Sequence, residues 1–240
     1  MPRSFLFLAL LLLAAPPAPA ALALETRQMT LAGEATLVNV YASEEGATRG
    51  LAVLAHGFTR SRERFSALAE RLAAEGLVVA VPDLPSWTGF HRNADAIVDL
   101  VRVLSRERGL DTLPVVLAGT SAGGLASLLA TDRVPRLALW LGLDPVDVEG
   151  ISEPAARGLR APAVVLRAPS APCNAFGSAK RIAAWLPNRR AFERFEGASH
   201  CDFESPSNWR CESVCGPADP AIQARIVEEA ASAVRAALAR

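Results

Sequence analysis

The chain has 240 residues and a mass of 25.3 kDa, and 51% of its residues are hydrophobic while 21% are charged. This composition supports a sizeable folded core and excludes an intrinsically disordered chain. The 25 basic and 25 acidic residues balance, so the chain has no overall positive charge for binding nucleic acid or an anionic membrane surface.

The first 23 residues have the pattern of a secretory signal peptide. Arg3 supplies a positive charge, residues 4–15 form an apolar stretch, and small residues then allow cleavage after Ala20 or Ala23. The apolar stretch is too short to cross a bilayer, so we expect no stable membrane insertion. We therefore expect a secreted or periplasmic protein in which residues 24–240 form a single domain.

Four cysteines, Cys173, Cys201, Cys211 and Cys215, lie in the last third of the chain. In an oxidising compartment an even number of cysteines predicts disulfides, here two bonds with three possible pairings. A zinc site is the alternative, but it favours paired C-x-x-C spacing or several nearby histidines, and only His200 is close in sequence. We therefore expect disulfides and no bound metal.

From residue 26 onward, short apolar runs rich in β-branched residues alternate with helical patterns, which predicts an α/β fold. We expect a mostly parallel, twisted sheet of about eight strands with helices on both faces. The first two strands alternate apolar and polar residues and suit an antiparallel edge. The expected strands are 28–31, 35–41, 51–55, 77–81, 113–118, 137–143, 163–166 and 192–195, and the expected helices are 61–74, 93–108 with Asn93 as its cap, 124–132, 178–186 and Asp219 to the C-terminus.

A Gly-x-Ser-x-Gly motif, Gly119 to Gly123, stands between an expected buried strand and an expected helix. In this context the motif is typical of a nucleophile elbow, a sharp turn that exposes a serine at the carboxyl end of a strand. Its glycines are needed because the strand and helix backbones crowd there. Ser121 is the predicted nucleophile, and the alternative is a glycine-rich turn with an incidental serine.

A serine hydroxyl needs a base to take its proton, and the chain has three histidines, His56, His91 and His200. Only His200 follows Ser121, which matches the chain order of serine, acid and histidine that accompanies this elbow. His200 is therefore the predicted base. We expect His56 to brace a neighbouring loop by hydrogen bonds and His91 to lie at the surface.

The predicted acid is Asp144. No carboxylate stands in the usual acid position, after the strand at 163–166, whereas Asp144 ends the preceding strand at the same sheet edge as the nucleophile. Its role would be to hold the tautomer of His200 and to stabilise the imidazolium. Asp147 is the second choice and Asp202 the third.

Two backbone N–H groups are also needed to stabilise the negative charge that develops in acyl transfer. We expect one from Ala122, directly after the nucleophile, and one from Phe58, where the preceding Gly57 lets the backbone approach. Phe58 and Trp87 are predicted apolar walls for the substrate, although ordinary loop packing explains Trp87 equally well.

In this order the motifs resemble the α/β-hydrolase superfamily, and within it the chlorophyllases and the bacterial polyester-hydrolase-like enzymes, which are cutinase-like or dienelactone-hydrolase-like. The resemblance covers about residues 50–203 and implies an α/β-hydrolase fold, without a large cap because only about 18 residues separate Asp144 from Ala163. It departs from these families at Thr120, where they usually have histidine, and at Ala122, where chlorophyllases usually have arginine, so chlorophyll is not implied as substrate. The segments that carry it are His56-Gly57-Phe58, Val81-Pro82-Asp83-Leu84, Gly119-Thr120-Ser121-Ala122-Gly123-Gly124, Leu143-Asp144-Pro145-Val146-Asp147 and Ser199-His200-Cys201-Asp202-Phe203.

The resemblance also bears on the acid and on the cysteines. The Leu-Asp-Pro-Val-Asp segment is similar to the chlorophyllase pattern in which the acid follows the sixth strand, which supports Asp144. The polyester-hydrolase branch implies a disulfide from the loop after the seventh strand to the histidine loop. Here that bond would join Cys173 to Cys201 and would leave Cys211 to pair with Cys215.

Together these features predict an exported, monomeric serine hydrolase that cleaves a small-molecule or polymeric carboxylic ester through an acyl-enzyme on Ser121. The expected reaction needs no cofactor, and no nucleic-acid partner is expected. An acyltransferase or a peptidase with the same triad is an alternative enzyme. A binding protein that kept the fold and lost the reaction is the alternative from another class.

Overall fold

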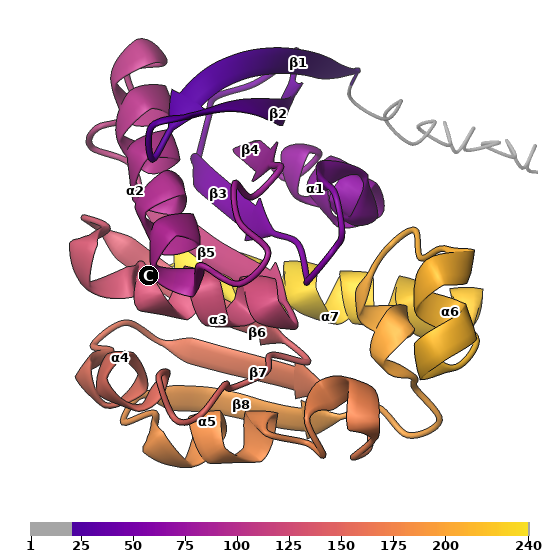
Figure 1. The fold of residues 1–240 in the computed structure, drawn as a ribbon. Helices are drawn as coiled ribbons and strands as arrows, with labels where there is room; N and C mark the ends of the chain where they lie inside the picture. Colours follow the sequence, from indigo (N-terminus) through magenta and orange to yellow (C-terminus); the bar gives the residue numbers. More distant parts are fainter. Residues whose placement is uncertain (1–20, 240) are drawn as a thin grey trace, which may run out of the picture.

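The computed structural model describes residues 21–239, and residues 1–20 of the predicted signal peptide lie outside this range. Its centre is an eight-stranded sheet in the order β1-β2-β4-β3-β5-β6-β7-β8 (Figure 1). The strands are β1 (Leu22–Leu31), β2 (Glu34–Ser43), β3 (Gly50–Ala55), β4 (Leu77–Pro82), β5 (Val115–Thr120), β6 (Leu137–Leu143), β7 (Ala163–Arg167) and β8 (Arg189–Arg194).

The strands β3 to β8 run parallel, while β1 and β2 pair antiparallel with each other and β2 pairs antiparallel with β4. The predicted fold class and the predicted antiparallel edge are therefore confirmed. Cleavage of the signal peptide after Ala20 would leave β1 whole, whereas cleavage after Ala23 would remove its first two residues.

The buried strands β3, β4 and β5 are continuous apolar runs because both faces of the sheet are covered. Successive side chains of β3 enter opposite halves of the core: Leu51 and Val53 pack on one face, and Ala52 and Leu54 on the other. This two-sided burial is what makes the sheet rigid enough to hold loops at its carboxyl edge.

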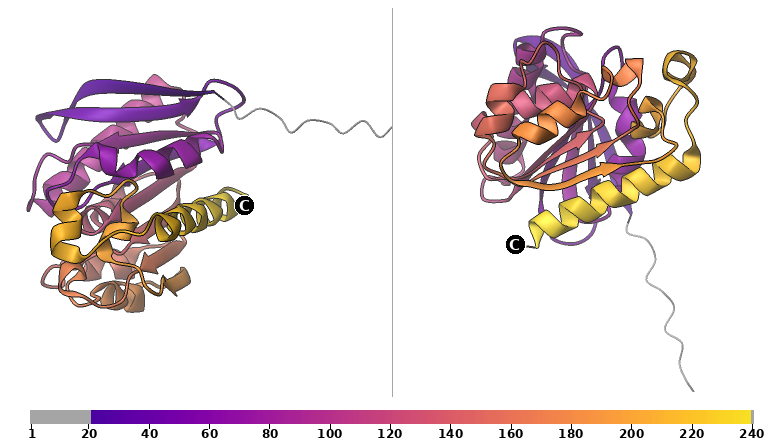
Figure 2. Two further views of the ribbon diagram at one scale, coloured as in Figure 1. Left: turned by 90° about the vertical axis from the view of Figure 1, so that its right-hand side faces the viewer. Right: turned by 90° about the horizontal axis from the view of Figure 1, so that it is seen from below.

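Helices cover both faces, as Figure 2 shows for α7, which lies across the face opposite most of the others. Buried residues of α2, α3, α4 and α5 pack on one face of the sheet, and buried residues of α1 and α7 pack on the other face. The helices are α1 (Ser66–Ala73), α2 (Phe90–Glu107), α3 (Ala122–Leu129), α4 (Glu153–Gly158), α5 (Ala179–Trp185), α6 (Trp209–Cys215) and α7 (Pro220–Leu238), with the short 3-10 turns η1 (Arg62–Phe65), η2 (Thr131–Arg133), η3 (Pro172–Asn174) and η4 (His200–Phe203).

One predicted helix cap is confirmed and one is wrong. The Asp219 carboxylate accepts a hydrogen bond from the Ala221 N–H at 2.8 Å and caps α7 as expected. The helix expected to begin at Asn93 begins at Phe90 instead, because the Asn93 side chain bonds both backbone groups of Ser86 in the preceding loop.

Only the six-residue helix α4 interrupts the connection between β6 and β7, so no large cap domain covers the sheet edge in the part of the chain that the structure describes. The sequence did not predict α4 or α6, which are both short. Within residues 21–239, none of the helices combines the length and the apolar character that crossing a membrane requires.

Candidate active site

Ser121 stands in a sharp turn between β5 and α3 with φ 55° and ψ −124°, in a region that residues with side chains rarely adopt. The glycines of the motif make this turn possible. A Cβ atom on Gly119 would come closer than 3.0 Å to the backbone of Gly123, and one on Gly123 would come closer than 3.0 Å to the carbonyls of Ala55 and His56. The crowding expected from the motif is therefore present.

His200 and Asp144 form a buried pair at the same sheet edge. The Nδ1 atom of His200 donates a hydrogen bond to Asp144 Oδ2 at 2.6 Å, and the Asp144 side chain is 0% exposed. His200 and Ser121 line one cavity of about 330 Å³. The structure thus brings together all three residues expected to form the triad.

Asp144 is held by further donors besides His200. The Ala168 N–H donates to Asp144 Oδ1 at 3.1 Å, and the Asn174 amide donates to Oδ2 at 3.1 Å. Asn174 is itself fully buried, and its side-chain oxygen accepts hydrogen bonds from the Ala171 and Gly177 N–H groups. This network keeps the carboxylate turned toward the histidine.

Sequence reasoning missed Asn174. The only signal for it was its position in the loop after β7, where the acid of a serine hydrolase usually stands and where this chain has no carboxylate. The polar side chain in that loop supports the acid instead of being the acid.

The other two candidate acids bond groups other than His200. Asp147 accepts a hydrogen bond from the Ser152 N–H at 3.1 Å within its own loop. Asp202 accepts one from the Ser199 N–H at 2.7 Å and so caps its own 3-10 turn. Neither contact directs a carboxylate at the histidine ring, so the geometry favours Asp144.

The loop that carries His200 is anchored to the sheet by Thr120. The Thr120 hydroxyl, in the last residue of β5, donates a buried hydrogen bond to the Phe203 carbonyl at 2.8 Å. Thr120 thus has a positioning task in this chain, at the site where the resembling families usually have histidine. It ties the end of the nucleophile strand directly to the turn that holds the base.

The two backbone N–H groups expected to bind an oxyanion lie beside the nucleophile. Ala122 is the first residue of α3, and a Cβ atom on Gly57 would lie 3.2 Å from the Ser121 Cβ, so the chain before Phe58 passes close to the serine. Among the described residues, no backbone carbonyl accepts a hydrogen bond from the N–H group of Ala122 or of Phe58. The prediction that they bind a substrate oxygen therefore stands beside two N–H groups without a backbone partner among the described residues.

His56 braces this oxyanion loop, as expected. Its Nε2 accepts a hydrogen bond from the Leu84 N–H at 2.8 Å, so the proton resides on Nδ1, which donates to the Gly57 carbonyl at 2.9 Å. Burial lowers the pKa of His56 and keeps the ring neutral. His91 is exposed, which also agrees with the sequence.

Phe58 and Trp87 form an edge-to-face pair with ring centroids 6.2 Å apart. Phe58 is 52% exposed and lines the cavity beside Ser121. Trp87 is 68% exposed and supports Phe58 from outside, because the described residues that line the cavity do not include it.

The predicted disulfide pairing, Cys173–Cys201 with Cys211–Cys215, is wrong. The structure pairs Cys173 with Cys215 and Cys201 with Cys211, at Cα separations of 5.6 Å and 5.8 Å. Cys211 and Cys215 lie four residues apart on α6, and Cβ atoms at this spacing are about 5–6 Å apart, too far for a disulfide. The helix α6 was not predicted, so this constraint was not visible in the sequence.

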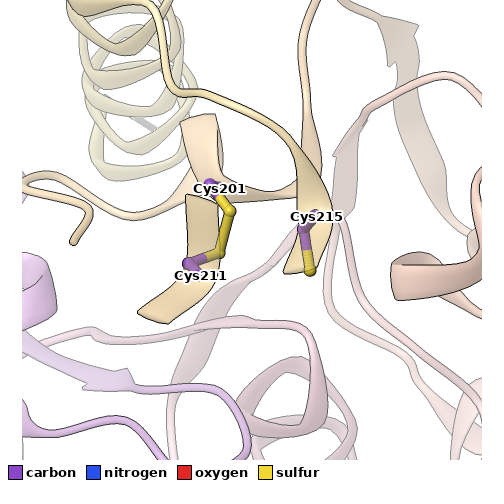
Figure 3. A group of neighbouring side chains, drawn as sticks. All are labelled: Cys201, Cys211 and Cys215. Atoms are coloured by element: carbon purple, nitrogen blue, oxygen red, sulfur yellow. A yellow bond between two sulfur atoms is a disulfide. The ribbon is translucent and has the colours of Figure 1, made fainter. Parts of the chain in front are cut away.

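Three of these sulfur atoms, on Cys201, Cys211 and Cys215, lie within 4.8 Å of one another (Figure 3). Such spacing would suit a metal site, but each sulfur is bonded in a disulfide and no thiolate is left to bind an ion. The bonds tie α6 to the residue after His200 and to the residue before Asn174. They therefore fix the turn that carries His200 and the loop whose Asn174 bonds Asp144.

A family profile described as the alpha/beta hydrolase family matches residues 52–236, and the chain belongs to this family. A search of curated proteins finds no match. Among solved structures, the crystal structure of dienelactone hydrolase from Anabaena variabilis is similar, with a TM-score of 0.68 and 20% sequence identity over 87% of this chain and 96% of that one. At this identity the likeness concerns the fold, and it agrees with the expected α/β-hydrolase fold.

The disulfide pairing can be read by peptide mapping without reduction. Trypsin should release one species of three linked peptides, 168–180, 195–210 and 211–225, because the last of these holds two cysteines bonded to different partners. Additional cleavage after Glu212 should then separate it into two linked pairs. A tryptic peptide 211–225 with an internal bond would restore the pairing expected from the sequence.

The buried neutral His56 predicts a pH dependence of stability. The pKa of His56 is lower in the folded than in the unfolded chain. The neutral ring therefore makes its full contribution to the free energy of unfolding above about pH 6.5. As the pH falls below that value, this contribution decreases by up to about 1.4 kcal/mol per pH unit. Urea unfolding of the wild type and of His56→Gln between pH 7.5 and 5.0 measures this. The wild type should lose more stability than the variant, while the exposed control His91→Gln should behave like wild type; equal losses in all three proteins would contradict the prediction.

Proposed function

We propose that this protein is a serine hydrolase that cleaves carboxylic esters through an acyl-enzyme on Ser121. One observation carries the proposal: a buried Asp144–His200 hydrogen bond of 2.6 Å lies beside a strained serine in a single cavity. A carboxylate that orients a histidine next to a serine is the arrangement that activates a hydroxyl nucleophile.

In the proposed reaction, the Ser121 Oγ attacks the ester carbonyl carbon while His200 Nε2 takes the hydroxyl proton. Asp144 holds the Nδ1 proton and stabilises the imidazolium, and the Phe58 and Ala122 N–H groups stabilise the oxyanion. The imidazolium then gives its proton to the leaving alkoxide. Water, activated by the same histidine, releases the acid and restores the serine, and no cofactor is required.

The open edge of the sheet supports an ester substrate that extends into solvent. No large cap encloses the cavity, and exposed Phe58 and Val214, at 52% and 77%, stand in its wall. Small-molecule and polymeric esters both fit such a site. The predicted signal peptide and the two disulfides support export, and we further propose that the protein acts as a monomer outside the cytoplasm.

An acyltransferase or a peptidase would use the same residues and differ only in the acceptor or in the bond that is cleaved. The ordered contacts around Asp144 support a catalytic role over a purely binding one, because they orient a histidine toward the cavity that contains Ser121. Turnover of a panel of esters and amides, with water, alcohols and amines as acceptors, separates these activities.

A fluorophosphonate probe tests the nucleophile. The mature protein should gain the mass of one adduct, and peptide mapping should place that adduct on Ser121, because only an activated serine attacks phosphorus at neutral pH. The Ser121→Ala variant should gain none. Absence of labelling in a folded wild-type protein, or labelling at another residue, would overturn the proposed function.

Two neighbouring aspartates test the acid. Asp144→Asn should lower kcat for a p-nitrophenyl ester by about 10³- to 10⁴-fold, because the histidine loses the partner that fixes its tautomer. The matched control Asp147→Asn should retain activity within about tenfold, because its carboxylate bonds the Gly150 and Ser152 N–H groups of its own loop and the Arg181 guanidinium. The reverse pattern would make Asp147 the acid.

A further inference from the structure

The buried ion pair of Arg60 and Glu204 forms part of the cavity wall, and the reaction proposed above does not use it. The Arg60 Nε atom lies 2.8 Å from Glu204 Oε1, and the two side chains are only 9% and 5% exposed. Both residues line the cavity that contains Ser121 and His200. A carboxylate is therefore held at low solvent exposure next to the proposed base.

One oxygen of this carboxylate, Glu204 Oε2, is buried and has no hydrogen-bond partner among the described residues. Burying a charged oxygen without a partner costs free energy, so such a group calls for an explanation in function. The ion pair with Arg60 satisfies only the other oxygen.

Glu204 directly follows the turn η4 that begins with His200, and its N–H donates a hydrogen bond to the Cys201 carbonyl at 3.1 Å. This bond closes the turn and places Glu204 on the same short segment as the histidine. The Gln223 side chain also donates to the Glu204 carbonyl at 2.7 Å, which fixes the segment against α7.

The groups that face the Glu204 carboxylate come from several elements. Burial raises the pKa of Glu204, while Arg60 from the loop after β3, His200 from η4 and Arg64 from η1 counter that rise by favouring the ionised form. Arg210 from α6 lines the same cavity. The named neighbours of the Glu204 carboxylate are positive, or become so when His200 gains a proton. Asp144 bonds the Nδ1 atom of the same histidine ring.

We propose, on the basis of the serine-hydrolase function proposed above, that Glu204 is a positioning residue for His200. With Asp144 it stabilises the imidazolium that forms when Ser121 gives up its proton, and Arg60 keeps it ionised. Glu204 exchanges no proton: the proton passes from Ser121 Oγ to His200 Nε2 and then to the leaving alkoxide.

The variant Glu204→Gln tests this role by its pH profile. A negative charge beside the base favours the protonated histidine, so its removal should shift the acidic limb of kcat/KM by about one pH unit toward lower pH. It should also lower kcat at the plateau by about tenfold, with KM unchanged, because the imidazolium is stabilised only after the serine loses its proton. The control Glu193→Gln, which removes an exposed carboxylate from β8, should match wild type.

A second variant guards against misfolding, since Glu204→Gln leaves the Arg60 guanidinium buried without its partner. The double variant Arg60→Gln with Glu204→Gln removes both charges and should shift the acidic limb in the same direction by a smaller amount, because the loss of the positive charge partly offsets the loss of the negative one. An acidic limb that stays in place in these folded variants would overturn the proposal. A higher KM with unchanged kcat and pH profile would also overturn it, because Glu204 would then be a substrate contact.

Fluorophosphonate labelling of the same preparations distinguishes failure of the serine-hydrolase function from failure of the role of Glu204. If wild type labels on Ser121 but the pH profiles of the variants do not move, only the role of Glu204 fails. If wild type does not label, the serine-hydrolase function fails and the role of Glu204 fails with it.

Discussion

The hydrogen bond between Asp144 and His200 is the contact on which the rest of the site depends. It joins the end of β6 to the turn η4, two segments separated by 56 residues. The carboxylate is fully buried, so it must be satisfied by protein donors, and the Ala168 N–H and the Asn174 amide supply them. The loop after β7 thus supplies the hydrogen-bond donors that the buried carboxylate of Asp144 requires.

The parallel sheet explains why these groups meet. In a parallel sheet all strands present their carboxyl ends at one edge, so the loops after β3, β5, β6 and β7 gather there. Those loops carry, in that order, Phe58, Ser121 and Asp144, the proposed oxyanion donor, nucleophile and acid, and then Asn174, which supports Asp144. Burial of both sheet faces gives these loops a rigid base, which proton transfer between neighbouring side chains requires.

The helix α6 forms one wall of the cavity through Arg210, Cys211, Val214 and Cys215. A helix of seven residues is marginal by itself, because too few hydrogen bonds repay the cost of its first turn. The bonds Cys201–Cys211 and Cys173–Cys215 hold both of its ends against the site. The wall formed by α6 is therefore firm while the cavity remains open to solvent.

The sequence by itself determined the class of fold, and it singled out the three residues that we propose as nucleophile, base and acid. Each of these rests on local chemistry: apolar periodicity, a glycine-flanked turn, and the position of Asp144 directly after a strand whose end must lie beside that of β5. The tertiary structure alone decided the cysteine pairing, the support of Asp144 by Asn174 and the burial of Glu204 with Arg60. These contacts join segments far apart in the chain, and no pattern of neighbouring residues encodes which distant partner the packed loops will bring within bonding distance.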